Sequence, residues 1–145
     1  MNRAWILPAL LALCGALAAV SLFTRENPVA AVAFVLLFAV LAVINSPLIF
    51  PRSITDAQAR STPDGRPVVY WRPGCKYCAR LRIRLGADAD RVHWVNIWAD
   101  PDAAARVRAA NDGNETVPTV FVAGRPYVNP EPAWVKGRLA SPTAR

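Results

Sequence analysis

Side chains that bind metals are scarce in this sequence. The 145 residues include one histidine, His93, and three cysteines, of which Cys14 lies in an apolar run far from Cys75 and Cys78. A structural zinc site needs four ligands, usually two cysteine pairs or one pair with histidines. Three cysteines are also too few for the disulfide framework that stabilises small secreted domains. We therefore predict no metal site and no disulfide-dependent fold, although a structural Cys75–Cys78 disulfide remains an alternative.

Acidic side chains are few as well. The chain has 10 Asp and Glu against 17 Lys and Arg, a net charge of +7 that is carried almost wholly by arginine. No nucleic-acid-binding motif accompanies this basic balance, so we expect no nucleic-acid partner. Part of the charge is expected to form a basic surface around the cysteine pair, which could also contact anionic lipid headgroups. Its members are Arg72, Lys76, Arg80, Arg82 and Arg84.

Two long apolar runs are present instead. Trp5–Phe23 contains no charge and is long enough to span a membrane, and Val29–Ile44 can be extended past Ser46-Pro47. Neither run has a polar face at helical spacing, which a helix packed on the core of a soluble domain would turn toward water. The first run could also be a signal peptide that ends near Ala16–Ala18, and the second would still hold the protein in the membrane. We predict a membrane hairpin over residues 1–50, with helices at about 5–23 and 29–49.

The flanking charges predict how this hairpin is oriented. Arg3 precedes the first run, and the connector holds Arg25 beside Glu26. Three arginines follow the second run: Arg52, Arg60 and Arg66. Because cytoplasmic flanks carry the excess of Lys and Arg, we expect a two-helix protein of the cell membrane whose C-terminal domain faces the cytoplasm.

The chemistry is concentrated in a short stretch after the hairpin. Val68–Trp71 is a β-branched and aromatic run typical of a buried strand, and Pro73-Gly74 breaks the chain. Cys75 and Cys78 then open a segment with helical spacing, and a C-x-x-C at a helix start is the redox arrangement of thioredoxin-like folds. The unpaired N–H groups and the dipole at a helix N-terminus stabilise a thiolate, so the first cysteine of such motifs titrates at about 3.5–7.5. We therefore assign Cys75 as the nucleophile and Cys78, one turn into the helix, as the thiol placed to attack a mixed disulfide on Cys75.

The rest of the chain predicts an α/β domain. Residues 51–66 are rich in Pro, Ser, Thr and Gly and are expected to be a linker that can include a short helix around 56–60, before a domain at 67–145. Asp100-Pro101 is a typical helix start, and Asn129-Pro130 is expected to cap a last helix that ends near Leu139. The expected elements are strands at 91–98, 119–122 and 125–128 and a helix at 101–110. With the first strand and helix, their order is β-α-β-α-β-β-α.

Two motifs in this domain resemble those of a known family. Tyr70–Cys78, Y-W-R-P-G-C-K-Y-C, is similar to the active-site stretch of glutaredoxins. Asn111–Val120, N-D-G-N-E-T-V-P-T-V, followed by Asn129-Pro130, resembles the mycoredoxins, the glutaredoxins that use mycothiol. The resemblance implies a thioredoxin fold with a four-stranded mixed sheet. It also implies reduction of mixed disulfides between proteins and mycothiol, with mycothiol as a co-substrate and no bound cofactor.

The resemblance also assigns residues that bind the thiol. It implies a cis peptide bond between Val117 and Pro118, which would turn the Val117 backbone toward Cys75. Tyr77 is expected to lie along the bound thiol, and Asn129 to help hold it. Thr116 and Lys76 complete the expected thiol-binding set. Lys76 replaces the usual glycine or proline, and its charge is expected to lower the Cys75 pKa further.

Three functions remain open from the sequence. The first is a membrane-anchored, mycoredoxin-like oxidoreductase that acts through Cys75 on mycothiolated or disulfide-containing proteins. The second is a dithiol reductase of the thioredoxin or ribonucleotide-reductase-redoxin type, which would use Cys75 and Cys78 together. The third is a membrane redox sensor in which the state of the two cysteines changes the binding of a partner.

Overall fold

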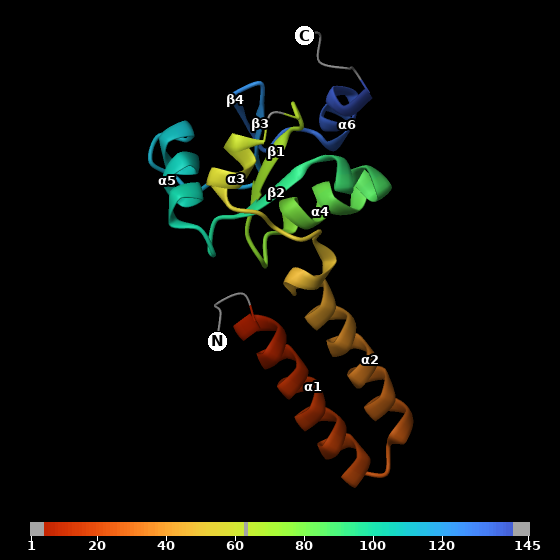
Figure 1. Ribbon diagram of the computed structural model, residues 1–145. Helices are drawn as coiled ribbons and strands as arrows, with labels where there is room; N and C mark the ends of the chain where they lie inside the picture. The colour runs from red at the N-terminus through yellow and green to blue at the C-terminus, as the bar shows by residue number, and fades with distance from the viewer. Residues whose placement is uncertain (1–4, 63, 141–145) are drawn as a thin grey trace. The chain divides into compact units, whose positions relative to one another are not determined.

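The chain forms two units in the computed structural model, which describes residues 5–62 and 64–140 (Figure 1). One unit reaches to Ile49, and the other begins at Phe50. Arg3, used above to predict the orientation, and Pro63, within the expected linker, lie outside the described residues.

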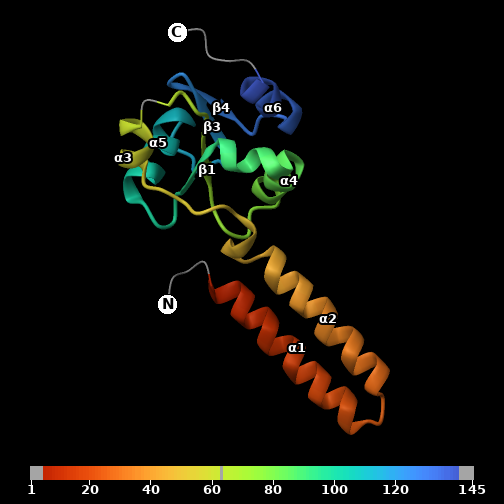
Figure 2. The ribbon, with the colours of Figure 1, turned by 45° about the vertical axis from the view of Figure 1, so that its right-hand side comes forward.

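The first unit is a pair of helices, α1 (Ile6–Thr24) and α2 (Pro28–Ile44), which lie side by side (Figures 1 and 2). Asn27 caps α2, because its side chain accepts a hydrogen bond from the Ala30 N–H at 3.3 Å, and Pro28 occupies the first turn. The helices approach closely at Gly15, where a Cβ atom would lie 2.6 Å from the Cβ of Phe38. A glycine is therefore required at this crossing.

Among the described residues, one helix has the length and apolarity of a membrane span. It is α1, with 19 residues and a mean hydropathy of 2.4, and this judgement rests on length and composition alone. The second helix has 17 residues and ends at Ile44. Its expected extension to residue 49 is wrong, because Pro47 has no N–H to continue the helix and Ser46 Oγ accepts the Leu48 N–H at 3.2 Å. A short 3₁₀ turn, η2 (Pro47–Ile49), follows instead.

The second unit is built on a four-stranded mixed sheet. Its strands are β1 (Val68–Trp71), β2 (His93–Asn96), β3 (Thr119–Val122) and β4 (Arg125–Val128). They are arranged in the order β2-β1-β3-β4, with β1 and β2 parallel and the other pairs antiparallel. The centre of the sheet is fully buried, as the side chains of Val69, Val95 and Val120 show. This architecture confirms the expected α/β class with a mixed sheet.

Helices cover both faces of this sheet (Figures 1 and 2). On one face α4 (Lys76–Leu85) packs against α6 (Pro132–Ala140), and on the other α5 (Pro101–Ala110) packs against α3 (Asp56–Ser61). A 3₁₀ segment, η3 (Gly86–Arg91), follows α4. The order from β1 to α6 is the predicted β-α-β-α-β-β-α, and α5 begins at Pro101 because the Asp100 side chain accepts hydrogen bonds from two N–H groups of its first turn.

The last helix begins later than expected. Asn129 does not cap α6, which starts at Pro132. Its backbone has a positive φ of 45°, and its N–H donates to the Pro118 carbonyl at 2.8 Å. Asn129 therefore ends the β3–β4 hairpin instead of opening the helix.

Phe50, expected to end the hairpin, and the first half of the expected linker at 51–66 both contact the sheet. The Phe50 ring stacks on Trp71 with centroids 3.7 Å apart, and the Ile54 N–H donates to the Trp94 carbonyl at 2.9 Å. Thr55 then caps α3, in which Asp56 is only 3% exposed. These apolar and backbone contacts place residues 50–61 within the second unit, so the α/β unit is larger than the sequence pattern indicated.

Candidate active site at the start of α4

The site begins where β1 leaves the core. Trp71 is buried at the end of the strand, and Pro73-Gly74 turns the chain, with a φ of 74° at Gly74 that favours glycine. Cys75 then occupies the N-cap of α4, and its Sγ accepts a hydrogen bond from the Cys78 N–H at 3.2 Å. The first sulfur therefore has the place that a capping oxygen would take, at the positive end of the helix dipole.

The second cysteine lies beneath the first. Cys78 is completely buried, whereas Cys75 is partly exposed. Both thiols are free, and their Sγ atoms are 2.6 Å apart, with the Cys78 thiol donating to Cys75. A partner can therefore reach Cys75 directly, while Cys78 is within reach of Cys75 alone.

The two thiols have opposite ionisation behaviour. The hydrogen bond from the Cys78 thiol lowers the pKa of Cys75 to about 6, against the opposing effect of its burial. The backbone N–H groups of Cys78 and Tyr77 and the charge of Arg72 lower this pKa as well. The pKa of Cys78 is raised far above its ordinary value, because its proton is held in the bond to Cys75 and because it is buried. Cys75 is therefore largely a thiolate near neutral pH, and Cys78 keeps its proton.

The cation that acts on Cys75 is not the expected one. Lys76 was expected to lower the Cys75 pKa, but its ammonium lies over the Tyr77 ring, 4.9 Å from the centroid. Arg72, which precedes the Pro-Gly turn, supplies the charge instead. In the sequence, Arg72 was placed only within the basic surface around the cysteine pair and was not singled out.

A loop before β3 faces the nucleophile. The Val117–Pro118 peptide bond is cis, as expected, and the Cys75 thiol lies 3.4 Å from the Val117 carbonyl oxygen. The buried hydroxyl of Thr119 donates to the Thr116 carbonyl at 2.8 Å, which fixes the loop on its other side. The backbone of Val117 is thus presented beside the reacting sulfur.

One residue that holds this loop was missed in the sequence. The side-chain amide of Asn111 donates to the Val107 carbonyl at 2.8 Å and to Thr119 Oγ1 at 3.1 Å. It therefore links the end of α5 to the strand that follows the cis peptide. In the sequence Asn111 stands out only as the first residue of the stretch that resembles mycoredoxins, because its buried role depends on tertiary contacts.

The remaining predicted residues are placed as follows. Lys76 and Tyr77 are exposed in the first turn of α4, and the Tyr77 side chain is 45% accessible. Thr116 is exposed directly before Val117, and Asn129 reaches Pro118 through its backbone N–H. The structure therefore brings Cys75, Cys78 and the cis-proline loop together by direct contact, whereas the side chains of Thr116 and Asn129 lie on the surface next to that loop.

A separate buried polar cluster lies behind β1. The Tyr70 hydroxyl donates to Asp56 Oδ1, and two arginines approach the same carboxylate, Arg60 at 3.6 Å and Arg106 at 3.8 Å. Burial and the neighbouring carboxylate raise the pKa of Tyr70 above its ordinary value. This cluster fastens α3 and α5 to the sheet, and its hydrogen bonds and ion pairs among the described residues reach neither cysteine.

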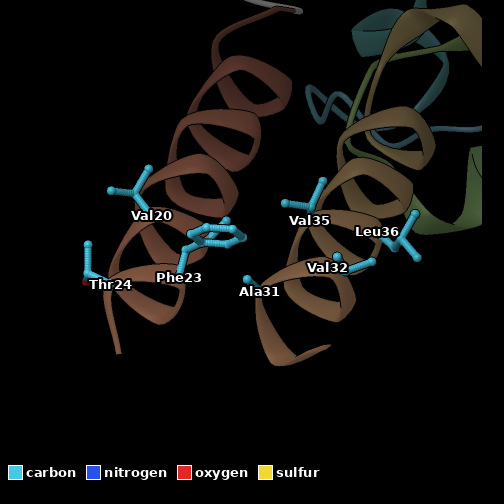
Figure 3. A pocket seen from close by; sticks show the side chains of 8 residues that line it. Val20, Phe23, Thr24, Ala31, Val32, Val35 and Leu36 are labelled. Carbon is cyan, nitrogen blue, oxygen red and sulfur yellow. The ribbon is translucent and has the colours of Figure 1, made fainter. Parts of the chain in front are cut away.

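A pocket in the first unit offers no chemistry of this kind. It encloses about 430 Å³ between α1 and α2 and is lined by apolar side chains, with Thr24 as the one polar member (Figure 3). No group that titrates or acts as a nucleophile lines it. Of the three free cysteines in the described part of the chain, Cys75 and Cys78 at the start of α4 are the two that lie together.

Comparisons with known proteins agree with this geometry. The glutaredoxin family model matches residues 68–127, which contain the cysteine pair and the cis-proline loop. Two Mycobacterium tuberculosis proteins, named "Putative glutaredoxin MT3292" (strain CDC 1551 / Oshkosh) and "Putative glutaredoxin Rv3198A" (strain ATCC 25618 / H37Rv), are each 39% identical to the chain over 72 residues. The matched region is 49% of this chain and 86% of each relative. The first unit lies outside the family match, and the second unit carries it. The chain belongs to the glutaredoxin family and is a thiol–disulfide oxidoreductase.

Proposed function

We propose that this oxidoreductase removes mycothiol from mixed disulfides on proteins, with Cys75 as the nucleophile. The observation that carries the proposal is the contrast between the two thiols. Cys75 is accessible and has a pKa of about 6, whereas Cys78 is buried and keeps its proton. Such a site supports attack by one sulfur. The mycothiol assignment rests on the resemblance of Tyr70–Cys78 and Asn111–Val120 to mycoredoxins.

The reaction balances as two exchanges. The Cys75 thiolate attacks the mycothiol sulfur of the mixed disulfide, so a new disulfide joins Cys75 to mycothiol and the protein leaves as a thiolate that takes up a proton. The thiolate of a second mycothiol then attacks the mycothiol sulfur bound to Cys75. This step releases oxidised mycothiol and restores the Cys75 thiolate. The mixed disulfide and one free mycothiol thus give the protein thiol and oxidised mycothiol, so the free mycothiol is the reductant and the bound mycothiol only changes its disulfide partner.

The thiol preference is tested by turnover of the full chain in detergent. A mixed-disulfide peptide is supplied with mycothiol, glutathione or a thioredoxin system, each with its NADPH-linked reductase. We expect the highest kcat/KM with mycothiol. Turnover with glutathione but not with mycothiol would contradict the mycothiol assignment. Activity that depends on thioredoxin reductase would favour a dithiol route.

The dithiol route is the second candidate, because the two Sγ atoms are only 2.6 Å apart. In that route Cys75 forms a mixed disulfide with the protein substrate, and Cys78 attacks Cys75 to release the reduced substrate and leave an intramolecular disulfide. An external dithiol must then reduce that disulfide. The two routes differ in their need for Cys78.

Membrane anchoring is the remaining part of the proposal. The apolar α1 and the shorter α2 support a hairpin in the bilayer, with α2 near the lower end of the span range of about 17–25 residues. Extraction of membranes at alkaline pH should leave the full chain in the pellet. The arginines that follow α2 favour a cytoplasmic α/β unit.

A further inference from the structure

A groove lies between α4 and α6, on the helix that Cys75 caps. It encloses about 310 Å³ and is lined by six residues: Arg80, Arg84, Glu131, Pro132, Ala133 and Lys136. The two helices pack together in both views of the ribbon (Figures 1 and 2). None of these residues belongs to the site described above.

The groove has a strong excess of positive charge. Three of its six residues are cations, and Glu131 is the single acid. Glu131 pairs with Arg80 at 3.3 Å, but both side chains are more than half exposed, so the pair is weak and can exchange partners. Arg84 and Lys136 have no carboxylate within 4 Å in the described part of the chain. Two cations are thus available to an external anion.

The groove lies at a defined distance from the nucleophile. A helix rises about 1.5 Å per residue, so Arg80 and Arg84 are about 7.5 Å and 13.5 Å along the axis from Cys75. An extended peptide advances about 3.4 Å per residue. A substrate segment whose mixed disulfide lies at Cys75 would therefore reach these arginines with residues two to four positions away from its cysteine.

We propose that this groove binds an acidic segment of the protein substrate and so orients its mixed disulfide toward Cys75. The inference rests on the proposed function and names the class of partner. A peptide is favoured over a lipid headgroup, because the groove is concave and lies on the helix whose cap is the nucleophile. Arg72 extends the same sign of charge to the sulfur itself.

The test compares peptides that differ only in charge near the mixed disulfide. Full chain in detergent is assayed with peptides that carry Glu, Gln or Lys at the second to fourth positions on one side of the cysteine. We expect the Glu peptide to have the highest kcat/KM, because its KM is the lowest while kcat is similar for the three peptides. This preference for the Glu peptide should disappear at 0.5 M salt, which screens the charges. Arg84→Glu and Lys136→Glu should each lower kcat/KM for the Glu peptide about 3- to 10-fold and leave the Gln peptide unchanged.

A matched control reverses the same charge elsewhere. Arg125 is exposed on β4 and does not line the groove, so Arg125→Glu should leave the preference for the Glu peptide intact. If a charge reversal impairs folding, Arg84→Gln and Lys136→Gln replace it. Each should lower kcat/KM for the Glu peptide about half as much, on a logarithmic scale, as the corresponding reversal. A loss shared equally by the Glu and Gln peptides, or by the Arg125→Glu variant, would overturn the proposal.

Docking and turnover can also be separated. The same peptides with serine in place of cysteine cannot react, so fluorescence anisotropy measures their binding alone. Tighter binding of the Glu peptide supports the groove even where the mycothiol assignment fails in the turnover assay. Equal binding of all three peptides overturns the proposal and leaves the groove to another anionic surface, such as lipid headgroups.

Discussion

At the scale of single residues, the site depends on where each cysteine lies in one helical turn. Cys75 is at the cap, where N–H groups and the Cys78 thiol point toward it, and Cys78 is inside the core. A cysteine side chain is therefore a thiolate at position 75, whereas the cysteine three residues later keeps its proton. The C-x-x-C spacing predicted this division, but it could not supply the neighbouring charge, which comes from Arg72 instead of Lys76.

The first prediction concerns the pH dependence of Cys75. Because its pKa is lowered to about 6, the thiolate fraction rises from pH 5 to 7 and is nearly constant above pH 7. The rate of alkylation by iodoacetamide should follow the same curve with a midpoint near pH 6. The measurement uses reduced full chain with Cys14→Ser, and Cys75→Ser serves as the blank. A midpoint near 8.5, the ordinary thiol value, would contradict the proposed stabilisation of the thiolate.

The second prediction compares two neighbouring cations. Arg72→Gln should raise the midpoint of the Cys75 alkylation curve by several tenths of a pH unit, since a partly exposed charge contributes roughly 0.2–1 kcal/mol. Lys76→Gln should move it less, because the Lys76 ammonium lies over Tyr77. Both variants remove one positive charge, so each is the control for the other. A larger shift in Lys76→Gln would show that this side chain turns toward the sulfur in solution.

The third prediction separates the two catalytic routes. Cys75→Ser should abolish reduction of mixed disulfides, because a serine hydroxyl is not ionised near neutral pH. Cys78→Ser should keep much of the activity when mycothiol is in excess, since the free thiol resolves the intermediate on Cys75. Loss of turnover in Cys78→Ser, with an unchanged circular dichroism spectrum, would reject the single-cysteine route and favour the dithiol route. Full activity in Cys75→Ser would reject both routes.

At the scale of helices and strands, the sequence predicted most where a local signal marks a boundary. Asp100-Pro101 marked the start of α5, and β3 and β4 have the predicted bounds. The errors came from tertiary contacts. Asn129 was taken as a helix cap, but its N–H donates to the Pro118 carbonyl. Residues 51–66 were taken as a linker, although the Ile54 N–H donates to the Trp94 carbonyl of β2.

The fourth prediction concerns the end of α5. Asn111→Ala removes both side-chain hydrogen bonds, to the Val107 carbonyl and to Thr119 Oγ1, at a buried position. The free energy of unfolding should fall by about 1–3 kcal/mol, because buried acceptors lose their partner. Asn114→Ala, at an exposed position three residues later, should cost less than about 1 kcal/mol. Urea denaturation of both variants in detergent measures the difference, and equal losses would contradict the role of Asn111.

At the scale of the whole molecule, the family match and the apolar unit divide the chain. The glutaredoxin match begins at residue 68, whereas the helices that precede Phe50 have exposed leucines, valines and phenylalanines on most of their surface. Exposed apolar surface of this extent is unfavourable in water and suits a bilayer. The hydropathy of the sequence predicted this division well. It overestimated the second helix, which Pro47 ends early.

The last prediction concerns the side of the membrane on which Cys75 lies. Arg52, Arg60 and Arg66 follow the second helix, and the connector between the helices carries one arginine beside a glutamate. Because the side with more Lys and Arg stays in the cytoplasm, Cys75 should face inward. A thiol reagent that cannot cross membranes should leave Cys75 unlabelled in intact cells that express Cys14→Ser, and label it after permeabilisation. Cys75→Ser in the same background gives the blank, since the buried Cys78 is shielded in the folded protein. Prompt labelling in intact cells would reverse the orientation. Such a result would place the thiol in an oxidising compartment, where the same low pKa would serve the oxidation of exported proteins.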